Sequence, residues 1–398
     1  MMSPNQLISL AVKNFRSLAD VSLHTQPLTV LFGPNGAGKS ALLDALWFVR
    51  ECGIRGVDIA ASNRSHGIGL LWEGADEGAF ISIGIETQTT RYETLFGYSS
   101  GRIEKFIGEK LYSKRQNKVL IDRKMGSDKA VFQGFQEKLP FNELGKLIDP
   151  EKTSLTRYID FLNMTDLKSS THEITGLDQL LRGIRYYHAR SANFYKLRTL
   201  GSESSYETRL SGRAENLWSI LRNLRDKQVL DTRYDTIMGF MKDSFPSFKA
   251  LVIEQTGPNS VYASFIDKLR RQPIQASGIS DGQLQMLIQL TALFSEPDSS
   301  LILLDEPDLS LHPWALSVFA KAIETATKQW NKQVIIATHS PVLMSQFEPE
   351  QLLAVELDDR GQTIMKRVSE IEDIQDLLED YATGSLYMAE MIAAQSEN

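Results

Sequence analysis

The chain has 398 residues, of which 42% are hydrophobic, a formal net charge of −7 and a single cysteine, Cys52. That composition can build a sizeable core, but it excludes an internal disulfide and argues against a protein that coats nucleic acid over its whole surface. Because no stretch approaches the ~20 apolar residues of a membrane span and no signal segment opens the chain, we expect a cytoplasmic protein of two or three compact units, at ~150 residues each.

A phosphate-binding loop is the first motif along the chain. Residues 33–40 read Gly-Pro-Asn-Gly-Ala-Gly-Lys-Ser and fit G-x-x-x-x-G-K-[ST] at every required position. The apolar run 28–32 before the loop predicts a buried strand, and the run 41–48 after it predicts a helix. Glycines let backbone N–H groups point at phosphates, and the helix N-terminus adds a favourable dipole. The residues expected to hold the nucleotide here are Gly33, Asn35, Gly36, Ala37, Gly38, Lys39 and Ser40, with Lys39 on the β- and γ-phosphates and Ser40 on Mg²⁺.

The middle of the chain contains no motif that we can place. Residues 101–130 hold nine Lys/Arg against four acids, and a second cluster at 182–198 interleaves basic residues with aromatic ones such as Tyr186 and Tyr187. This composition suits phosphate contact and base stacking. Solvated hairpins, and strands whose tyrosines pack on the core, produce it more often. We favour the latter interpretation and keep DNA binding as a hypothesis.

A pair of carboxylates, Asp305 and Glu306, directly follows the apolar residues 301–304. Such a run is typical of a central parallel strand buried on both faces, and open α/β sheets bind ligands at the carboxyl ends of their strands. We expect Asp305 to hold Mg²⁺ and Glu306 to be the general base that activates water. Alone, the pair would fit a solvated loop equally well; the phosphate loop in the same chain favours catalysis.

A further apolar strand, 334–338, leads to His339. An imidazole at that sheet edge can bind the γ-phosphate and respond to its loss. Most histidines at strand ends are solvated or satisfied locally, but the position of His339, 34 residues after Asp305, favours a functional role. We therefore group His339 with Lys39 and Glu306 as catalytic residues.

The tetrapeptide Ser280-Asp281-Gly282-Gln283 lies about one helix ahead of the Asp-Glu pair. With this signature, the chain resembles ABC-type ATPases of the branch that includes RecF, the structural-maintenance-of-chromosomes heads and the overcoming-lysogenization-defect proteins, and most closely the bacterial AAA family ATPases of that branch. The resemblance covers roughly the first 100 and last 150 residues. The matching segments are 14–17, 33–40, 279–283, 305–313 and 338–341.

The resemblance implies an α/β fold of a definite kind. It is a P-loop NTPase head of the ABC type, with a mixed sheet plus a doubly wound parallel core, split by a mainly helical insertion. The expected parts are the first half of the head (1–100), an inserted lobe of hairpins and helices (101–250), the second half of the head (251–370) and a C-terminal helical tail (371–398).

The same resemblance implies that each nucleotide is bound from two sides. ATP on the phosphate loop of one subunit would be sealed by Ser280 and Gly282 of another. Asp281 stands where transporters have glycine. Its carboxylate would be repelled by a triphosphate unless it points away or caps the following helix.

Two further features of the family are carried over less directly. Arg16 and Ser17 match positions that contact the base or ribose of the nucleotide. The glutamine that couples Mg²⁺ to the inserted lobe has no clear counterpart, and Gln88 is one candidate.

Three functional classes compete. The first is an ATP-binding, ATP-hydrolysing switch with Mg²⁺ that forms a homodimer, or a larger assembly of dimers, and acts on DNA or on an effector protein such as a separate nuclease or toxin, in DNA repair or anti-phage defence. The second is an overcoming-lysogenization-defect nuclease, which needs a Toprim domain after the head; the 59 residues after His339 are too few for one. The third, a transporter subunit, is disfavoured by the Asn-Phe-Arg-Ser start and by Leu-His-Pro after the acidic pair. We expect the first class.

Overall fold

The unbroken apolar runs form a buried sheet in the computed structural model, which describes residues 5–133, 151–165, 172–296, 300–372, 376–377 and 381–393. This core sheet has six strands in the order β11-β16-β17-β3-β18-β19, and all neighbours are parallel except the last pair. Its strands are β3 (Leu28–Phe32), β11 (Arg185–His188), β16 (Leu301–Asp305), β17 (Gln333–Thr338), β18 (Leu352–Leu357) and β19 (Thr363–Arg367).

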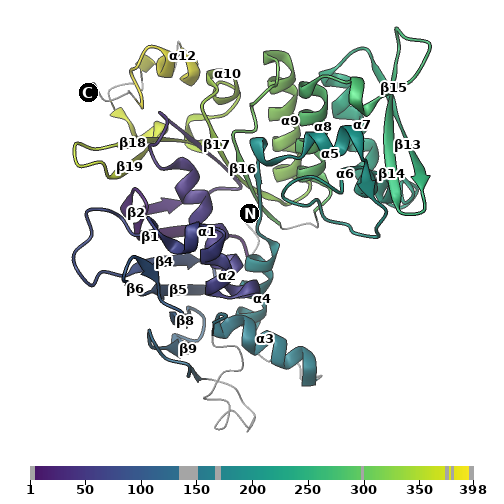
Figure 1. Cartoon of the computed structure of the whole chain (residues 1–398). Helices are drawn as coiled ribbons and strands as arrows, with labels where there is room; N and C mark the ends of the chain where they lie inside the picture. The colour runs from purple at the N-terminus through teal and green to yellow at the C-terminus, as the bar shows by residue number, and fades with distance from the viewer. Residues whose placement is uncertain are drawn as a thin grey trace.

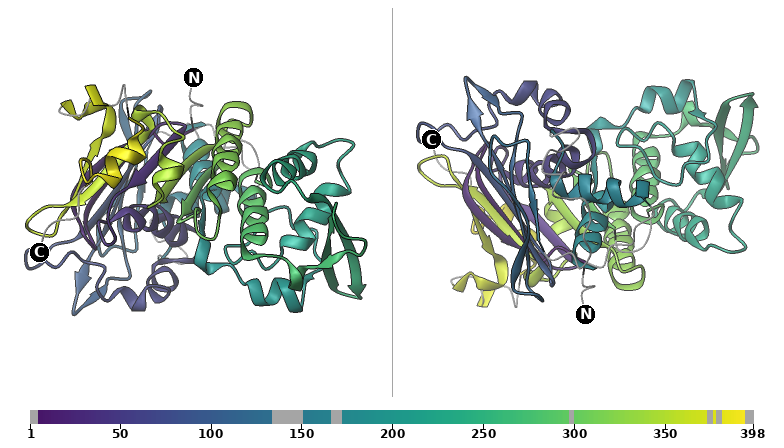
Figure 2. Two further views of the ribbon diagram at one scale, coloured as in Figure 1. Left: turned by 90° about the horizontal axis from the view of Figure 1, so that it is seen from above. Right: turned by 90° about the horizontal axis from the view of Figure 1, so that it is seen from below.

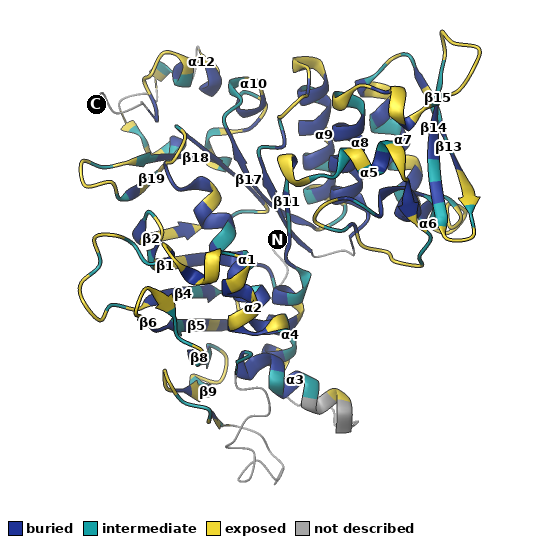
Figure 3. Cartoon of the chain, in the orientation of Figure 1, coloured by how far each residue is buried: buried dark blue, intermediate teal, exposed yellow. Residues whose placement is uncertain are grey.

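Both faces of the core sheet are covered, which explains why its central strands lack a polar alternation. Successive side chains of a strand point to opposite faces. In β16, Ile302 and Leu304 belong to the apolar cluster that includes α9 (Pro313–Gln329), whereas Leu301 and Leu303 belong to the cluster that includes α1 (Lys39–Arg55). Figure 3 shows these strands as the buried centre of the molecule.

A second sheet of seven antiparallel strands covers α1 on its other side (Figure 1), in the order β10-β9-β8-β5-β4-β1-β2. The helices α3 (Ser154–Thr165) and α4 (His172–Gly183) lie beside it. Residues 101–132, which we assigned to an inserted lobe, are therefore part of the first half of the head, because β8 pairs with β5. The strands are β1 (Ser9–Phe15), β2 (Leu18–His24), β4 (Ile81–Glu86), β5 (Thr90–Phe96), β8 (Gly108–Ser113), β9 (Lys118–Arg123) and β10 (Val131–Phe132).

A helical lobe lies beside the two sheets (Figures 1 and 2). At its centre is α8 (Asp281–Phe294), whose residues 284–294 are all buried. A small sheet, in which β12 and β13 flank β14 and β15 pairs with β14, closes the far side. The other elements of the lobe are α5 (Phe194–Thr199), α6 (Leu217–Arg225), α7 (Arg233–Ser244), β12 (Ser202–Glu203), β13 (Phe248–Gly257), β14 (Ser260–Asp267) and β15 (Ile274–Gln275).

The boundaries of this lobe differ from the sequence-based division in two places. Strand β11 was expected inside the lobe, but it pairs with β16 in the core sheet. Residues 251–267 were expected in the second half of the head, but they form the β13–β14 hairpin of the lobe. In both cases long-range pairing decided the position of a short strand.

The remaining short elements lie around the sheets. The C-terminal helix α12 (Thr383–Met388) contacts α10 (Pro341–Met344), and the ring of Tyr387 lies 5.6 Å from that of Phe32. Near the N-terminal half lie α2 (Val57–Ser62), β6 (Tyr98–Ser99) and β7 (Arg102–Ile103). Within the described residues, we find no helix that combines the length and the apolar character needed to cross a membrane.

Candidate nucleotide site

The parallel register brings the sequence motifs to one edge of the core sheet. Phe32 at the end of β3 pairs with Thr338 of β17, so the phosphate loop and His339 leave the sheet side by side. Asp305 at the end of β16 pairs with Ala337 on one side and with His188 of β11 on the other. Four chain segments that are far apart in sequence therefore meet at the carboxyl edge, where open α/β sheets bind ligands.

The phosphate loop, Glu306 and His339, together with Arg16 and Ser17, line one open cavity of about 390 Å³, a size that accommodates a nucleotide-scale ligand. Most of the predicted nucleotide residues contribute to it. Gly33 and Ala37, which were also expected to hold the nucleotide, are buried and are not among the lining residues. The lining residues are Arg16, Ser17, Asn35, Gly36, Gly38, Lys39, Ser40, Ala41, Glu306 and His339.

The phosphate loop has the backbone geometry that its glycines allow. Gly33 has φ +145°, and a Cβ atom there would lie 2.0 Å from the carbonyl oxygen of Val355, so the strand β18 leaves no room for a side chain. Gly38, with φ +105°, precedes the first residue of α1. The Nζ of Lys39 donates to the carbonyl oxygens of Gly33 (2.9 Å) and Pro34 (2.7 Å). Burial lowers the pKa of Lys39 to about 8.

Ser40 and Asp305, the two residues predicted to hold magnesium, lie within hydrogen-bond distance of each other. The Oγ of Ser40 donates to Oδ1 of Asp305 at 3.0 Å, and the hydroxyl of Tyr186 donates to Oδ2 at 2.7 Å. Burial raises the pKa of Asp305, while both hydrogen bonds oppose that change. A buried carboxylate beside a hydroxyl is an oxygen donor set that suits Mg²⁺, which prefers one or two protein ligands together with phosphate oxygens.

Glu306 lies next to this pair with a strained backbone. Its φ is +52°, and its N–H donates to the carbonyl of Ala337 at 2.8 Å. Its carboxylate forms an ion pair with Arg190, with 2.8 Å between Nε and Oε2. A non-glycine residue in this conformation is typical of functional sites. His339 lines the same cavity, and burial followed by the nearby charge of Lys39 lowers its pKa.

Arg16 and Ser17 flank the opening of the cavity and are each held by a side chain. Arg16 binds the carboxylate of Asp44 in α1 at 2.6 Å. The hydroxyls of Ser17 and Thr363 lie 2.9 Å apart, and Thr363 also donates to the carbonyl of Ala37 at 2.9 Å. The hydroxyl of Thr363 thus connects Ser17 to the phosphate loop by hydrogen bonds.

The signature segment lies on the helical lobe. Ser280 is the N-cap of α8: its Oγ accepts from the N–H of Gln283 at 3.2 Å in a capping box. Gly282 packs against the loop between β16 and α9, since a Cβ there would lie 2.7 Å from the carbonyl oxygen of Ser310. Neither Ser280 nor Gly282 is among the described residues that line the cavity of their own chain.

Asp281 points to a cation on the same lobe. Its Oδ1 accepts from Arg198 of α5 at 2.7 Å, and the same guanidinium donates to the carbonyl of Ile279 at 3.0 Å. Asp281 therefore does not cap α8, and its charge is balanced within the chain. Gln88 lies in the turn after β4, next to Glu86, which pairs with Ser9 at the end of β1 away from Arg16. It is wrongly placed for the coupling role.

Sequence reasoning did not assign Tyr186, His188 and Arg190 to this site. They follow one another along β11 and just beyond it, and they reach Asp305 and Glu306 because β11 pairs with β16. The basic and aromatic composition of 182–198 indicates a nucleic-acid surface or a core strand, and neither interpretation points to the nucleotide site. For Tyr187, which is 4% exposed, the core interpretation is correct.

A phosphate loop, an Asp-Glu pair and a histidine around one cavity, on a parallel sheet beside an antiparallel one, define an ATP-binding head of the ABC type. The family model described as "AAA domain, putative AbiEii toxin, Type IV TA system" matches residues 28–345. The chain belongs to that family, and the resemblance inferred from its motifs is confirmed.

Two known proteins are similar to this chain along most of its length. The chain is 25% identical over 365 residues to the OLD nuclease of Thermus scotoductus (88% of this chain, 62% of that protein). It is 26% identical over 390 residues to the Old nuclease of Escherichia phage P2 (93% and 62%). It therefore spans about three fifths of the length of these relatives. A solved structure of an SmcHead bound to the C-winged helix domain of ScpA matches with a TM-score of 0.53 at 15% identity, over 92% of this chain and 99% of that one, which supports the fold alone.

Proposed function

We propose that the protein hydrolyses ATP with Mg²⁺. The observation that carries the proposal is the meeting of Ser40, Asp305 and Glu306 at the mouth of the phosphate loop. Bound Mg²⁺ would neutralise charge on the phosphates, and Ser40 and Asp305 would hold it. Lys39 would stabilise the phosphate oxygens. Glu306 would orient and deprotonate the attacking water, while His339, whose lowered pKa favours the neutral form, would hydrogen-bond the γ-phosphate.

We further propose that ATP is bound between two copies of the chain. The exposed N-terminus of α8, with Ser280 and Gly282, is absent from the described lining of its own cavity. Helix N-termini are suited to bind anions. A second chain could therefore present its α8 N-terminus to the γ-phosphate, so that a single chain has half of a catalytic site. Because closure requires the γ-phosphate, ATP and ADP would differ in affinity for the closed dimer.

The output of the switch is part of the proposal. Relatives carry names that refer to nucleases and to DNA replication and repair. These names support action on DNA, and the family description, which mentions a putative toxin, supports the alternative of an effector protein. The role would then lie in repair or in phage defence. A cytoplasmic location fits such a role.

The dimer is tested by light scattering with and without ATP and Mg²⁺. We expect Glu306→Gln to accumulate as a dimer with ATP and Lys39→Ala to stay monomeric. Glu350→Gln, at an exposed carboxylate, is the matched control and should behave as the unmodified protein. Equal masses for the Glu306 and Lys39 variants would refute the two-sided site.

Hydrolysis in trans is tested separately with Ser280→Arg. This variant should bind ATP as the unmodified chain does but fail to hydrolyse it. Loss of ATP binding by the monomer would contradict the assignment of Ser280 to the opposite nucleotide.

A further inference from the structure

A fully buried carboxylate, Glu296, lies where the helical lobe joins the core sheet. Its side chain has 0% exposure. It follows Ser295, the C-cap of α8, and lies on the connection from α8 to β16. The chain thus runs from Ser280 through α8 and Glu296 to Asp305.

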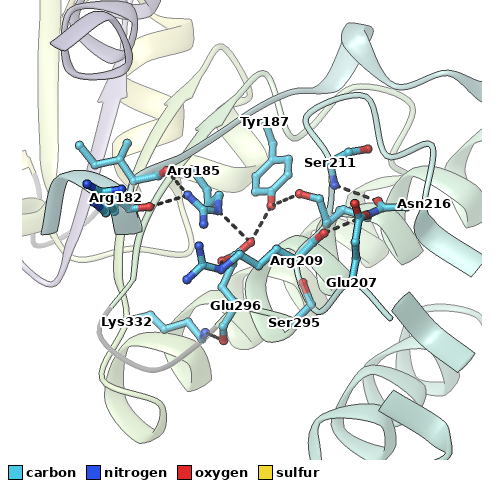
Figure 4. Close-up of polar contacts among 12 residues, drawn as sticks. Arg182, Arg185, Tyr187, Glu207, Arg209, Ser211, Asn216, Ser295, Glu296 and Lys332 are labelled. Atoms are coloured by element: carbon cyan, nitrogen blue, oxygen red, sulfur yellow. Dashed lines mark hydrogen bonds and ion pairs between the residues drawn. The ribbon is translucent and has the colours of Figure 1, made fainter. Parts of the chain in front are cut away.

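Glu296 is held by cations and by a tyrosine (Figure 4). Its Oε1 accepts from Nε of Arg185 at 3.2 Å. The hydroxyl of Tyr187 lies 3.2 Å from the same oxygen and 3.1 Å from the carbonyl oxygen of Leu210, so these two acceptors share its single proton. Arg209, from the segment before α6, approaches Oε2 at 3.7 Å. The Nζ of Lys332 donates to the main-chain carbonyl of Glu296 at 2.5 Å. Both Arg185 and Tyr187 belong to β11.

The opposite face of the same short strand reaches the nucleotide site. Side chains alternate along a strand, so Tyr186 points away from Arg185 and Tyr187. Its hydroxyl donates to Asp305, the predicted magnesium ligand. One face of β11 therefore contacts Glu296 at the end of α8, and the other face contacts Asp305 at the nucleotide site.

The chemistry of this junction is unusual for a core that needs only stability. Arg50 of α1 lies in the field of Arg185 and Arg209, and its pKa is lowered to about 10, first by burial and then by repulsion from Arg185. A buried ion pair is commonly no more stabilising than apolar residues of the same volume. In some proteins such groups instead fix one relative arrangement of two elements.

We propose that Glu296 is a positioning residue that couples α8, the helix that begins at the signature segment, to the nucleotide site. The contacts run from Glu296 to Arg185 and Tyr187 of β11, and from Tyr186, on the other face of β11, to Asp305. A change at Asp305 on nucleotide binding would reach Ser280 of the same chain by this route. The inference deepens the proposed ATPase function and rests on it.

The test is a double-mutant cycle on the steady-state ATPase. We expect Glu296→Gln to lower kcat by about tenfold, and Tyr186→Phe by a similar factor, with ATP affinity of the monomer kept within about twofold. The double variant should be no slower than the slower single variant by more than about twofold. The control Glu203→Gln, at an exposed carboxylate of β12 in the same lobe, should have full activity.

Each result that contradicts the proposed coupling has its own interpretation. Multiplicative losses in the double variant would mean that Glu296 and Tyr186 act separately, and would overturn the coupling. A fall in kcat in step with ATP affinity and melting temperature would show a structural role only. If Glu296→Gln does not fold, Tyr187→Phe removes a single hydroxyl and takes its place in the cycle.

A second readout does not depend on hydrolysis. In the unmodified protein, ATP with Mg²⁺ should slow amide hydrogen exchange in α1 and in α8. In Glu296→Gln it should slow exchange in α1 alone. An equal response of α8 in both proteins would overturn the inference, whereas a coupled response without any hydrolysis would instead refute the proposed function.

Discussion

Lys39 provides a prediction in which pH reports directly on the nucleotide site. Lys39 is a buried residue, 5% exposed, and burial lowers the pKa of its ammonium group to about 8. Bound phosphate oxygens favour the charged form and would return that pKa to its ordinary range or above. ATP binding above pH 8 therefore requires the uptake of a proton.

The sign and the size of the effect follow from linkage. Below pH 8 Lys39 is already protonated, so pH has little influence on affinity through this group. Above pH 8 the free protein loses the proton and affinity falls. With pKa about 8 in the free protein, the Kd for ATP should rise about tenfold between pH 7 and pH 9, and about 0.9 proton should be taken up per ATP at pH 9.

Titration calorimetry at pH 7, 8 and 9, in pairs of buffers with different ionisation enthalpies, measures both quantities. The matched control is Lys39→Arg, because a guanidinium stays protonated throughout this range. That variant should bind ATP with an affinity that does not change with pH. A flat affinity for the unmodified protein up to pH 9, without proton uptake, would refute the argument that burial lowers the pKa of Lys39.

Three further predictions follow from the packing. Gly33→Ala should destabilise the protein by about 3 kcal/mol or more in chemical denaturation, because the new Cβ would clash with the carbonyl of Val355. Gly36→Ala, which has open space around it, should cost only about 1 kcal/mol. Equal losses of stability in the two variants would contradict this steric explanation. Arg198→Ala removes two hydrogen bonds from the signature segment. Steady-state rates of ATP hydrolysis should fall about tenfold, whereas titration with a fluorescent nucleotide should show unchanged ATP binding by the monomer. Full activity would show that the signature segment keeps its conformation without Arg198. Cys52 is fully buried and burial raises its pKa, so Ellman's reagent should label it only after unfolding; rapid labelling of the native protein would contradict its placement.

The two halves of the proposed catalytic site lie on different bodies of one chain. Phosphate-binding groups come from the core sheet, and the signature comes from the helical lobe (Figure 1). Glu296, directly after the C-cap of α8, contacts Arg185 and Tyr187 of β11, and β11 pairs with β16 of the core sheet. The proposed switch requires that nucleotide at the core sheet changes the position of the lobe.

The sequence alone determined the features that depend on neighbouring residues. The phosphate loop between strand and helix, the buried strand ahead of Asp305 and Glu306, and the position of His339 each follow from a short contiguous pattern, and they lie where the motifs predict. Local backbone and side-chain chemistry is sufficient for such elements, since each motif contains its own turn residues and its own apolar strand.

The tertiary structure decided the features that depend on partners far away in the chain. Strand β11 could not be placed from its own four residues, and only its pairing with β16 brings Tyr186 to Asp305. The charge of Asp281, a difficulty in the sequence, is answered by Arg198, 83 positions earlier. In the sequence, Glu296 is an ordinary acidic residue after a helix, and only the structure shows that it is buried among cations. A residue type states what chemistry is available, whereas long-range packing states which groups meet, and no local pattern contains that information.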